Sequence, residues 1–221
     1  MIIFFDLDGP LLDVSERYQI LHRDLLDGMG VTSLAPTMYW QRKRKRCPEA
    51  AILKALGASE FEPSYSRRRL ELIEADSYLA HDRLWPWTIP VLTTLRSHYA
   101  LVLVTVRSNR EALERQLTCL ELRCFFRAVL TESAADPVDV QKARLIRHYL
   151  SQQDLSTRGS WIIGDTEADI GAGELLGLTT VAVRCGIRDD EQLARMNPTY
   201  LIDDIRALPD LISQRDGAGR Q

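Results

Sequence analysis

Two aspartates lie two residues apart directly after a short apolar run at the start of the chain. The run Ile2-Ile3-Phe4-Phe5 leads into Asp6-Leu7-Asp8-Gly9, and a run of this length is typical of a central parallel strand that is buried on both faces. In an extended chain, residues i and i+2 point the same way, so Asp6 and Asp8 can converge on one spot. Crowded carboxylates bind a divalent cation or divide the chemical roles between them. A strand end followed by a polar turn is the alternative without chemistry.

A hydroxyl follows a second apolar run. Leu101-Val102-Leu103-Val104 ends in Thr105, and Ser108 with Glu111 is expected to form a capping box that starts the next helix. Unpaired backbone N–H groups at such a helix start, next to a hydroxyl, suit a phosphate group. A threonine that simply ends a strand is the alternative.

A second acidic pair follows a third apolar run. Trp161-Ile162-Ile163 leads into Gly164-Asp165-Thr166-Glu167-Ala168-Asp169. If Thr166 caps the following helix, Asp169 lies in its first turn, near Asp165. Acidic residues here can also serve only as complements to the helix dipole. Since parallel strands place their carboxyl ends at one edge of a sheet, all three sites are expected to face one crevice.

The order of the elements predicts an α/β fold with a doubly wound parallel sheet and a small all-helical insert after the first strand. From Val14 to about Ala80 the apolar residues keep helical spacing, whereas from Trp85 onward apolar runs alternate with helices. The expected division is an α/β core of residues 1–13 and 85–214, a helical insert of residues 14–84 and a disordered tail of residues 215–221.

The composition excludes several classes of protein. The chain has 221 residues, 45% of them hydrophobic, and a net charge of −3, which argues against a nucleic-acid binder. No apolar stretch reaches the roughly 18 to 20 residues that span a membrane, so we expect a cytoplasmic protein. The oligomeric state stays open. No metal-site spacing links the cysteines, which are expected to be reduced: Cys47, Cys119, Cys124 and Cys185.

Lysine is rare in this chain. Of the 28 basic residues, four are lysines, at positions 43, 45, 54 and 142. Surface positions usually accept either basic residue. In a chain that uses arginine almost everywhere, each lysine is therefore a candidate for a specific role. Lys142 is the only lysine outside the helical insert. The alternative is a solvated lysine on a helix surface.

Together these motifs resemble the haloacid dehalogenase superfamily, specifically its aspartyl-phosphate phosphatases with a helical cap inserted after the first motif. The first motif is Asp6-Leu7-Asp8-Gly9, the second ends in Thr105, the third is Lys142 and the fourth runs from Gly164 to Asp169. The resemblance covers most of the chain and implies a Rossmann-like core, with residues 14–84 as the cap.

The resemblance also implies roles for these residues. Asp6 would be the nucleophile that forms an aspartyl-phosphate, and Asp8 would be the general acid and base. Thr105 and Lys142 would bind the transferring phosphoryl oxygens. The implied cofactor is Mg²⁺, which would be held by Asp6, the backbone carbonyl of Asp8, Asp165 and, directly or through water, Asp169.

Asp8 separates branches of the superfamily. Dehalogenases lack this second aspartate because halide leaves without a proton, so the resemblance implies a hydrolase of phosphate esters acting on a small phosphorylated metabolite. Phosphotransferases and mutases share Asp8 and remain an alternative, as does a non-catalytic member that binds a phosphorylated ligand.

The substrate should depend on the insert, since a cap that closes over a crevice contacts the leaving group. The insert carries the basic run Arg42-Lys43-Arg44-Lys45-Arg46, in which Arg42, Lys45 and Arg46 can share a helix face. If this face points inward, Arg42 and Arg46 bind further anionic charge on the substrate; a solvated helix face is the alternative. Arg107, two residues after Thr105, is either a further substrate donor or a surface arginine.

Overall fold

A six-stranded parallel sheet forms the centre of the protein, with the strand order β5-β4-β1-β6-β7-β8. The computed structural model describes residues 1–132 and 137–218. The predicted parallel sheet is confirmed, because every pair of neighbouring strands in it runs parallel. Its strands are β1 (Ile2–Phe5), β4 (Ala100–Val104), β5 (Ala128–Leu130), β6 (Trp161–Gly164), β7 (Thr179–Val183) and β8 (Tyr200–Ile202).

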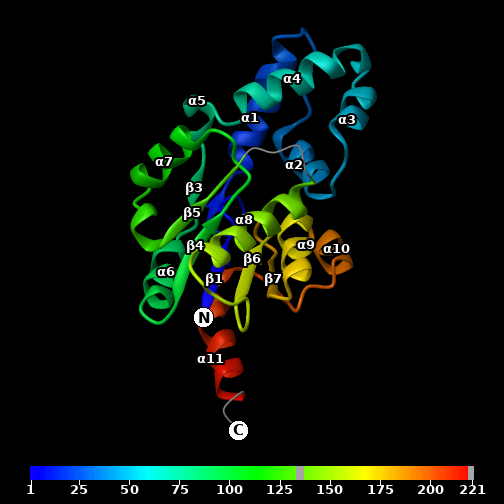
Figure 1. Ribbon diagram of the computed structural model, residues 1–221. Coiled ribbons are helices and arrows are strands. Elements are labelled where there is room, and N and C mark those ends of the chain that lie inside the picture. The colour runs from blue at the N-terminus through cyan, green and yellow to red at the C-terminus, as the bar shows by residue number, and fades with distance from the viewer. Residues whose placement is uncertain (133–136, 219–221) are drawn as a thin grey trace.

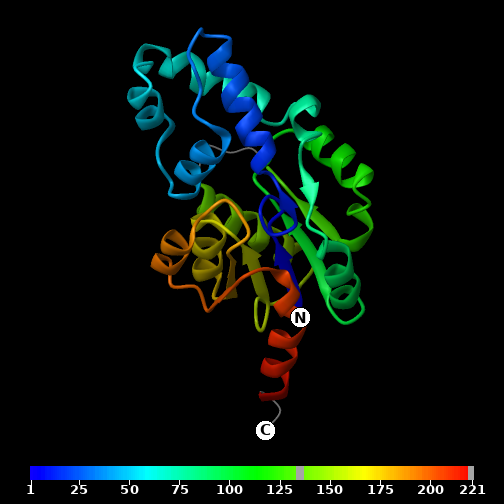
Figure 2. The same ribbon diagram turned by 180° about the vertical axis from the view of Figure 1, so that it is seen from behind.

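Helices cover both faces of this sheet, as a doubly wound fold requires (Figures 1 and 2). On β1, Ile2 and Phe4 pack in the cluster that includes α8 and α9, whereas Ile3 and Phe5 pack in the cluster that includes α6, α7 and α11. The alternation follows from the period of two of an extended strand. The helices are α6 (Thr88–Arg96), α7 (Arg110–Cys119), α8 (Val138–Gln152), α9 (Glu167–Leu176), α10 (Asp190–Arg195) and α11 (Leu208–Ala218).

Two expected features of the core differ in the structure. Asn109, not Ser108, caps α7, and its side chain accepts a hydrogen bond from the amide of Ala112, so the predicted capping box with Glu111 is wrong. Residues 215–218 belong to α11, although a disordered tail was expected from Arg215. Residues 219–221 of that expected tail lie outside the described residues.

Five helices form a layer above the carboxyl edge of the sheet, and we call them the helical cap (Figure 1). The chain enters and leaves the cap through a short antiparallel ribbon of β2 (Leu12–Asp13) and β3 (Arg83–Leu84). Two-residue strands are too short to be recognised from a sequence pattern, and this ribbon was not expected. The cap helices are α1 (Ser15–Asp27), α2 (Pro36–Arg44), α3 (Glu49–Ala55), α4 (Glu62–Leu72) and α5 (Asp76–Leu79).

Three short 3₁₀ segments complete the described elements: η1 (Ser59–Phe61), η2 (Arg123–Phe125) and η3 (Ile205–Ala207). The helical spacing expected up to about Ala80 is interrupted, because α4 ends at Leu72 and α5 starts at Asp76. Among the residues the structure describes, no helix is both long and apolar enough to cross a bilayer.

The cap has a hydrophobic cluster of its own, which supports our proposal that residues 14–84 form a separate unit. It contains Leu21, Leu25, Leu26, Leu53, Ala58 and Tyr65. His22 lies beside this cluster and is only 2% exposed. Its ring stacks on Tyr39 with a centroid separation of 3.9 Å, and its Nδ1 is 2.8 Å from the Tyr65 hydroxyl. A neutral imidazole is therefore packed inside the cap.

We expect His22 to make the protein sensitive to mild acid. Burial lowers the pKa of His22 to about 4. The unfolded chain binds this proton near pH 6.5, so the stability contribution is complete above that value and is lost as the pH falls toward 4. Between pH 7 and pH 5 His22 should account for a loss of about 2 kcal/mol in the free energy of unfolding.

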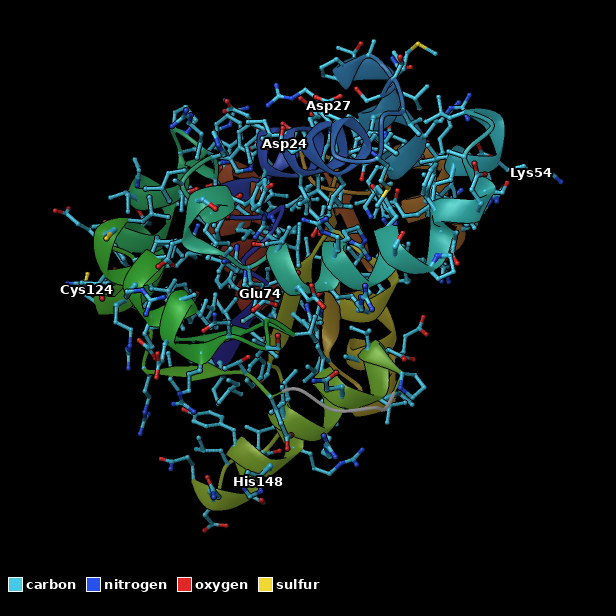
Figure 3. All side chains as sticks on the ribbon, turned by 90° about the horizontal axis from the view of Figure 1, so that it is seen from above. Asp24, Asp27, Lys54, Glu74, Cys124 and His148 are labelled. Carbon is cyan, nitrogen blue, oxygen red and sulfur yellow. The ribbon has the colours of Figure 1, made fainter. Side chains whose placement is uncertain are left out.

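Denaturant titrations at several pH values test this expectation. His22→Phe keeps a ring against Tyr39 and should show a shallower fall in unfolding free energy between pH 7 and pH 5. His148→Phe, at an exposed position of α8 that Figure 3 labels, should keep the parental slope. Equal slopes for the parent and His22→Phe would contradict the burial of a neutral His22.

Candidate functional site

The first, second and fourth motifs meet at the carboxyl edge of the sheet. Phe5, the last residue of β1, pairs with Leu103 in β4 and with Ile163 in β6. The amide of Asp6 donates to the carbonyl of Ile163 at 2.9 Å. The sheet register therefore brings Asp6 beside the segments that follow β4 and β6, where the second and fourth motifs lie.

Three carboxylates crowd together at this edge. Oxygens of Asp6, Asp165 and Asp169 all lie within 4.8 Å of one another, and all three residues are buried. Burial and the neighbouring carboxylates raise the pKa of Asp165 well above its ordinary value, and burial raises the pKa of Asp6 to about 7. Such a cluster is unfavourable unless positive charge compensates it.

The backbone around Asp165 leaves room for this crowding. Gly9, at a φ of +109°, comes so close that a Cβ atom there would stand 2.3 Å from the Asp165 carboxylate. A Cβ on Gly186 would stand 2.1 Å from the same group. The positive φ and the close approach both require glycine at position 9.

The acidic cluster has the properties of a cation site. Its donors are carboxylate oxygens, the ligands that Mg²⁺ prefers. Oδ2 of Asp165 accepts a hydrogen bond from the amide of Ile187, but Oδ1 is buried without a hydrogen-bond partner among the described residues. The side chain of Asp8 is not part of the cluster. A divalent cation bound to Asp6, Asp165 and Asp169 would satisfy the free oxygen and offset the repulsion.

Lys142 supplies positive charge to the acidic cluster. It projects from α8 and is 1% exposed, with its Nζ 2.9 Å from Asp6 and 2.5 Å from Asp169. Burial opposes its charge, but Asp169 and Asp6 raise the pKa of Lys142 above its ordinary value. Thr105 follows β4 and is also buried. Asp6, Thr105 and Lys142 line one cavity.

Asp169, the third acid of the cluster, is positioned by hydrogen bonds at the start of α9. Oδ2 of Asp169 accepts hydrogen bonds from the amide of Thr166 at 3.1 Å and from its hydroxyl at 2.7 Å. Thr166 is the N-cap of α9 and Asp169 lies in its first turn, as the sequence predicts, and the two residues form a capping box. Asp169 therefore caps the start of α9 with Oδ2 and accepts a hydrogen bond from Lys142 with Oδ1.

Asp8 occupies a different electrostatic environment, between two arginines. Arg17, from the first turn of α1, places a guanidinium nitrogen 2.5 Å from Asp8. Arg107, from the segment after β4, pairs with the other oxygen of Asp8. Burial alone would raise the pKa of Asp8, but Arg107 and Arg17 hold it well below its usual range. In this arrangement Asp8 is ionised.

The two arginines are themselves tied to a second buried acid. Asp82, which precedes β3, lies 3.2 Å from Nε of Arg17 and 3.1 Å from Arg107. Gln116 of α7 donates to Asp82 at 2.8 Å and accepts from Arg107. The ion pairs among Asp8, Arg17, Asp82 and Arg107 therefore link the cap to the core beside the ribbon.

A cavity of about 750 Å³ lies between the cap and the core, over Asp6. The site residues expected from the sequence that line it are Asp6, Asp8, Arg46, Thr105, Arg107 and Lys142. Asp165 and Asp169 lie in the buried acidic cluster and not in the lining. The cap contributes further lining residues that were not expected: Arg17, Tyr18, Lys43, Arg69 and Glu74.

The basic run of the cap is oriented differently from the expected face. Arg42 does not line the cavity, whereas Lys43 and Arg46 do. Arg44 instead reaches the core and donates to the carbonyls of Arg184 at 2.7 Å and Arg188 at 3.0 Å. The reason is that α2 ends at Arg44, so the run leaves the helix before the assumed helical spacing can place Arg42 and Arg46 on one face.

Glu74 occupies the helix start that was expected to offer free donors. Its carboxylate accepts from the amide of Ser108 at 3.0 Å and from that of Asn109 at 2.6 Å. Figure 3, which looks down on the cap, shows Glu74 near the middle of the molecule. The expectation of unpaired N–H groups at this point is therefore wrong in this structure, because the cap supplies an acidic partner.

Two of the unexpected lining residues carry a signal in the sequence. Arg17 interrupts an apolar helical stripe, at i+3 from Val14 and four residues before Leu21, and a charged residue on a buried face requires a partner. Lys43 is one of only four lysines, so the same reasoning that selected Lys142 applies to it. Nothing in the sequence distinguishes Arg69, since it is one of three consecutive arginines.

The family follows from a comparison of the whole chain. Residues 3–183 match the family described as haloacid dehalogenase-like hydrolase. The chain belongs to this family. The resemblance inferred from the four motifs is thereby confirmed, together with the assignment as an enzyme of the hydrolase class.

Relatives of this hydrolase align along nearly its whole length. A protein named phosphoglycolate phosphatase from Synechococcus elongatus is 23% identical over 201 residues, covering 91% of this chain and 92% of its own. A protein named pyrophosphatase PpaX from Bacillus mycoides is 24% identical over 232 residues, covering 97% and 98%. A haloacid dehalogenase-like family hydrolase from Streptococcus pneumoniae superposes with a TM-score of 0.72 at 23% identity, covering 95% and 97%. This structural likeness shows the shared fold.

The buried arginine beneath the cap should be required for stability. Arg17→Met leaves the carboxylates of Asp8 and Asp82 with one arginine between them and should lower the free energy of unfolding by about 3 kcal/mol. Arg23→Met removes an exposed arginine from the same helix and should cost less than about 0.5 kcal/mol. Denaturant unfolding of both variants checks this, and equal losses would contradict a structural role for Arg17.

The acidic cluster should bind a divalent cation measurably. Millimolar MgCl₂ should raise the melting temperature of the parent relative to EDTA, because a ligand that binds only the folded state stabilises it. Asp165→Asn should lose most of this rise, and in EDTA it should melt no lower than the parent, since one repelling charge is gone. Asp27→Asn, at an exposed position of the cap, should retain the full rise. An undiminished rise in Asp165→Asn would contradict this site.

Proposed function

We propose that this hydrolase is a Mg²⁺-dependent phosphatase, which cleaves a small phosphorylated metabolite through an aspartyl-phosphate intermediate on Asp6. The observation that carries the proposal is the environment of the Asp6 carboxylate. It lies 2.9 Å from the buried Lys142 ammonium, in the carboxylate cluster with Asp165, and at the floor of a cavity that the cap covers. A carboxylate that must attack an anionic phosphate needs such neighbouring positive charge.

Asp6 and the groups around it perform the first half of the reaction. A carboxylate oxygen of Asp6 attacks phosphorus, and the bond to the leaving oxygen breaks. Lys142 and Thr105 bind phosphoryl oxygens and hold the group in line. Mg²⁺, held by Asp6, the backbone carbonyl of Asp8, Asp165 and Asp169, would neutralise charge on the phosphoryl group.

Asp8 moves the protons. In the first half the protonated form of Asp8 gives its proton to the leaving oxygen, and in the second half the resulting carboxylate takes a proton from the water that attacks the aspartyl-phosphate, which restores the protonated form for the next cycle. The ion pairs with Arg17 and Arg107 favour the ionised form, which is the form that the second half needs. The cap covers the cavity and would exclude bulk water from the intermediate.

The relatives support hydrolysis and an anionic substrate. Both are named as hydrolases of phosphate compounds, phosphoglycolate and pyrophosphate, and each of these compounds carries a second anionic group. A phosphotransferase or mutase of the same superfamily is the second candidate, because such enzymes share the aspartate pair. A non-catalytic ligand-binding member is a third candidate, but Asp6, Asp8 and Asp165 are all present. The four free cysteines fit a cytoplasmic location.

Phosphate release from p-nitrophenyl phosphate tests the proposal. The parent should show turnover that depends on MgCl₂, and Asp6→Asn should reduce kcat by at least about 10³-fold because the nucleophile is gone. Asp27→Asn serves as the control for a neutralised acid and should keep the parental rate. No Mg²⁺-dependent turnover by the parent on any phosphate ester, or full activity of Asp6→Asn, would overturn the proposal.

A further inference from the structure

Lys43 of the cap lines the cavity and is paired with a partly buried acid, Glu49. Its Nζ lies 3.2 Å from the carboxylate of Glu49 and 4.8 Å from the ring centroid of Tyr18. The side chain of Lys43 is only 16% exposed and that of Glu49 only 13%. An ammonium group has three donors, so one bond to Glu49 leaves two for a ligand in the cavity.

A network inside the cap fixes Glu49 in turn. The hydroxyl of Tyr39 donates to Glu49 at 3.0 Å, and that of Tyr65 donates to it at 3.3 Å. His22 contacts both tyrosines, by stacking on Tyr39 and by its hydrogen bond with Tyr65. Since these rings are buried in the core of the cap, Glu49 holds the Lys43 ammonium at a defined point.

Arg69 brings a second cation from α4 to the same cavity. No hydrogen bond or ion pair of its guanidinium occurs within the described part of the chain, and its Nε is buried without a partner. The other arginines of the lining are matched by acids: Arg46 and Arg188 pair with Glu167, and Arg17 and Arg107 pair with Asp8. Arg69 therefore differs from these four arginines in having no acid partner in the described part of the chain, and it lies on the cap side of the cavity with Lys43.

We propose that Lys43 and Arg69 form an anion subsite, which binds a carboxylate or phosphate group on the leaving part of the substrate, and that Glu49 is its positioning residue. This subsite rests on the proposed function, because it lies in the same cavity as Asp6. It narrows the substrate class to phosphate esters or anhydrides with a second anionic group at the end away from the cleaved bond. A leaving group without such charge would leave the guanidinium of Arg69 without an anionic partner.

Three substrates with a two-carbon leaving group test the subsite. Ethyl phosphate has no second charge, phosphoglycolate adds a carboxylate, and ethylene glycol bisphosphate adds a phosphate. The parent should prefer one or both anionic substrates over ethyl phosphate, by about tenfold or more in kcat/KM for a charge-assisted contact, and the better one identifies the chemistry of the ligand. Lys43→Met and Arg69→Gln should each reduce this preference at least about fivefold.

Matched controls come from the same cap. Lys54→Met and Arg68→Gln remove an exposed lysine of α3 and the exposed arginine next to Arg69, and both should keep the parental preference. Figure 3 shows Lys54 at the outer edge of the cap. An unchanged preference in Lys43→Met and Arg69→Gln, or no preference in the parent, would overturn the subsite.

Glu49→Gln tests the positioning role, since glutamine can still accept from Tyr39 and Tyr65. We expect it to raise KM for the anionic substrate with little change in kcat, and Lys43→Met/Glu49→Gln should lose no more preference than Lys43→Met alone. Independent losses that add in the double variant would contradict positioning through Lys43.

A binding measurement separates this inference from the proposed function. In Asp6→Asn protein, calorimetric titration with phosphoglycolate, ethylene glycol bisphosphate and ethyl phosphate reports the subsite without turnover. If an anionic compound binds more tightly than ethyl phosphate, and Lys43→Met abolishes this difference in affinity, the subsite is supported even if the parent hydrolyses none of the three compounds. Turnover of all three esters with equal affinity would sustain the phosphatase and overturn the subsite.

Discussion

The repulsion among buried carboxylates at one sheet edge is the constraint on which the rest of the structure depends. Oxygens of Asp6, Asp165 and Asp169 lie within 4.8 Å of one another, and burial of the three residues limits the screening of their charges by water. Lys142 offsets part of this charge by direct contact with two of them. The residual negative charge and the free oxygen of Asp165 would favour a cation at this site.

The buried charge of Asp8 is compensated by arginines and not by a lysine, and these ion pairs also connect the cap to the core. Two arginines hold Asp8, one from the cap and one from the core, and Asp82 at the foot of the cap matches them. Further polar contacts join the cap to the core, such as those of Arg44 with backbone carbonyls and of Glu74 with backbone amides, and Tyr18 and Trp40 of the cap pack against the hydrophobic core.

Sequence patterns predicted the core well because they reflect local rules. The apolar runs before Asp6, Thr105 and Asp165 are buried strands, and strand direction alone brings their ends to one edge. Lys142 stood out through composition, in a chain that otherwise uses arginine outside the cap. These inferences required no knowledge of how distant helices pack.

The cap residues were harder to predict because their positions depend on packing between elements. Helical periodicity cannot show that α2 ends at Arg44, and that end decides which residues of the basic run face the cavity. Nor can it show that Glu74, 34 residues before Ser108, occupies the start of α7. Partners distant in sequence are set by the tertiary fold, and local patterns do not contain them.

Chemical trapping of Asp6 is the most direct test of the central claim, that this carboxylate becomes phosphorylated. Asp8→Asn should slow attack by water, whereas p-nitrophenol leaves without needing a proton, so the intermediate should accumulate with p-nitrophenyl phosphate and MgCl₂. Borohydride reduces an acyl phosphate to an alcohol, so peptide mass spectrometry should find homoserine at position 6, and only when substrate is present. Phosphate release with an unmodified Asp6, or with homoserine at another aspartate, would contradict the account.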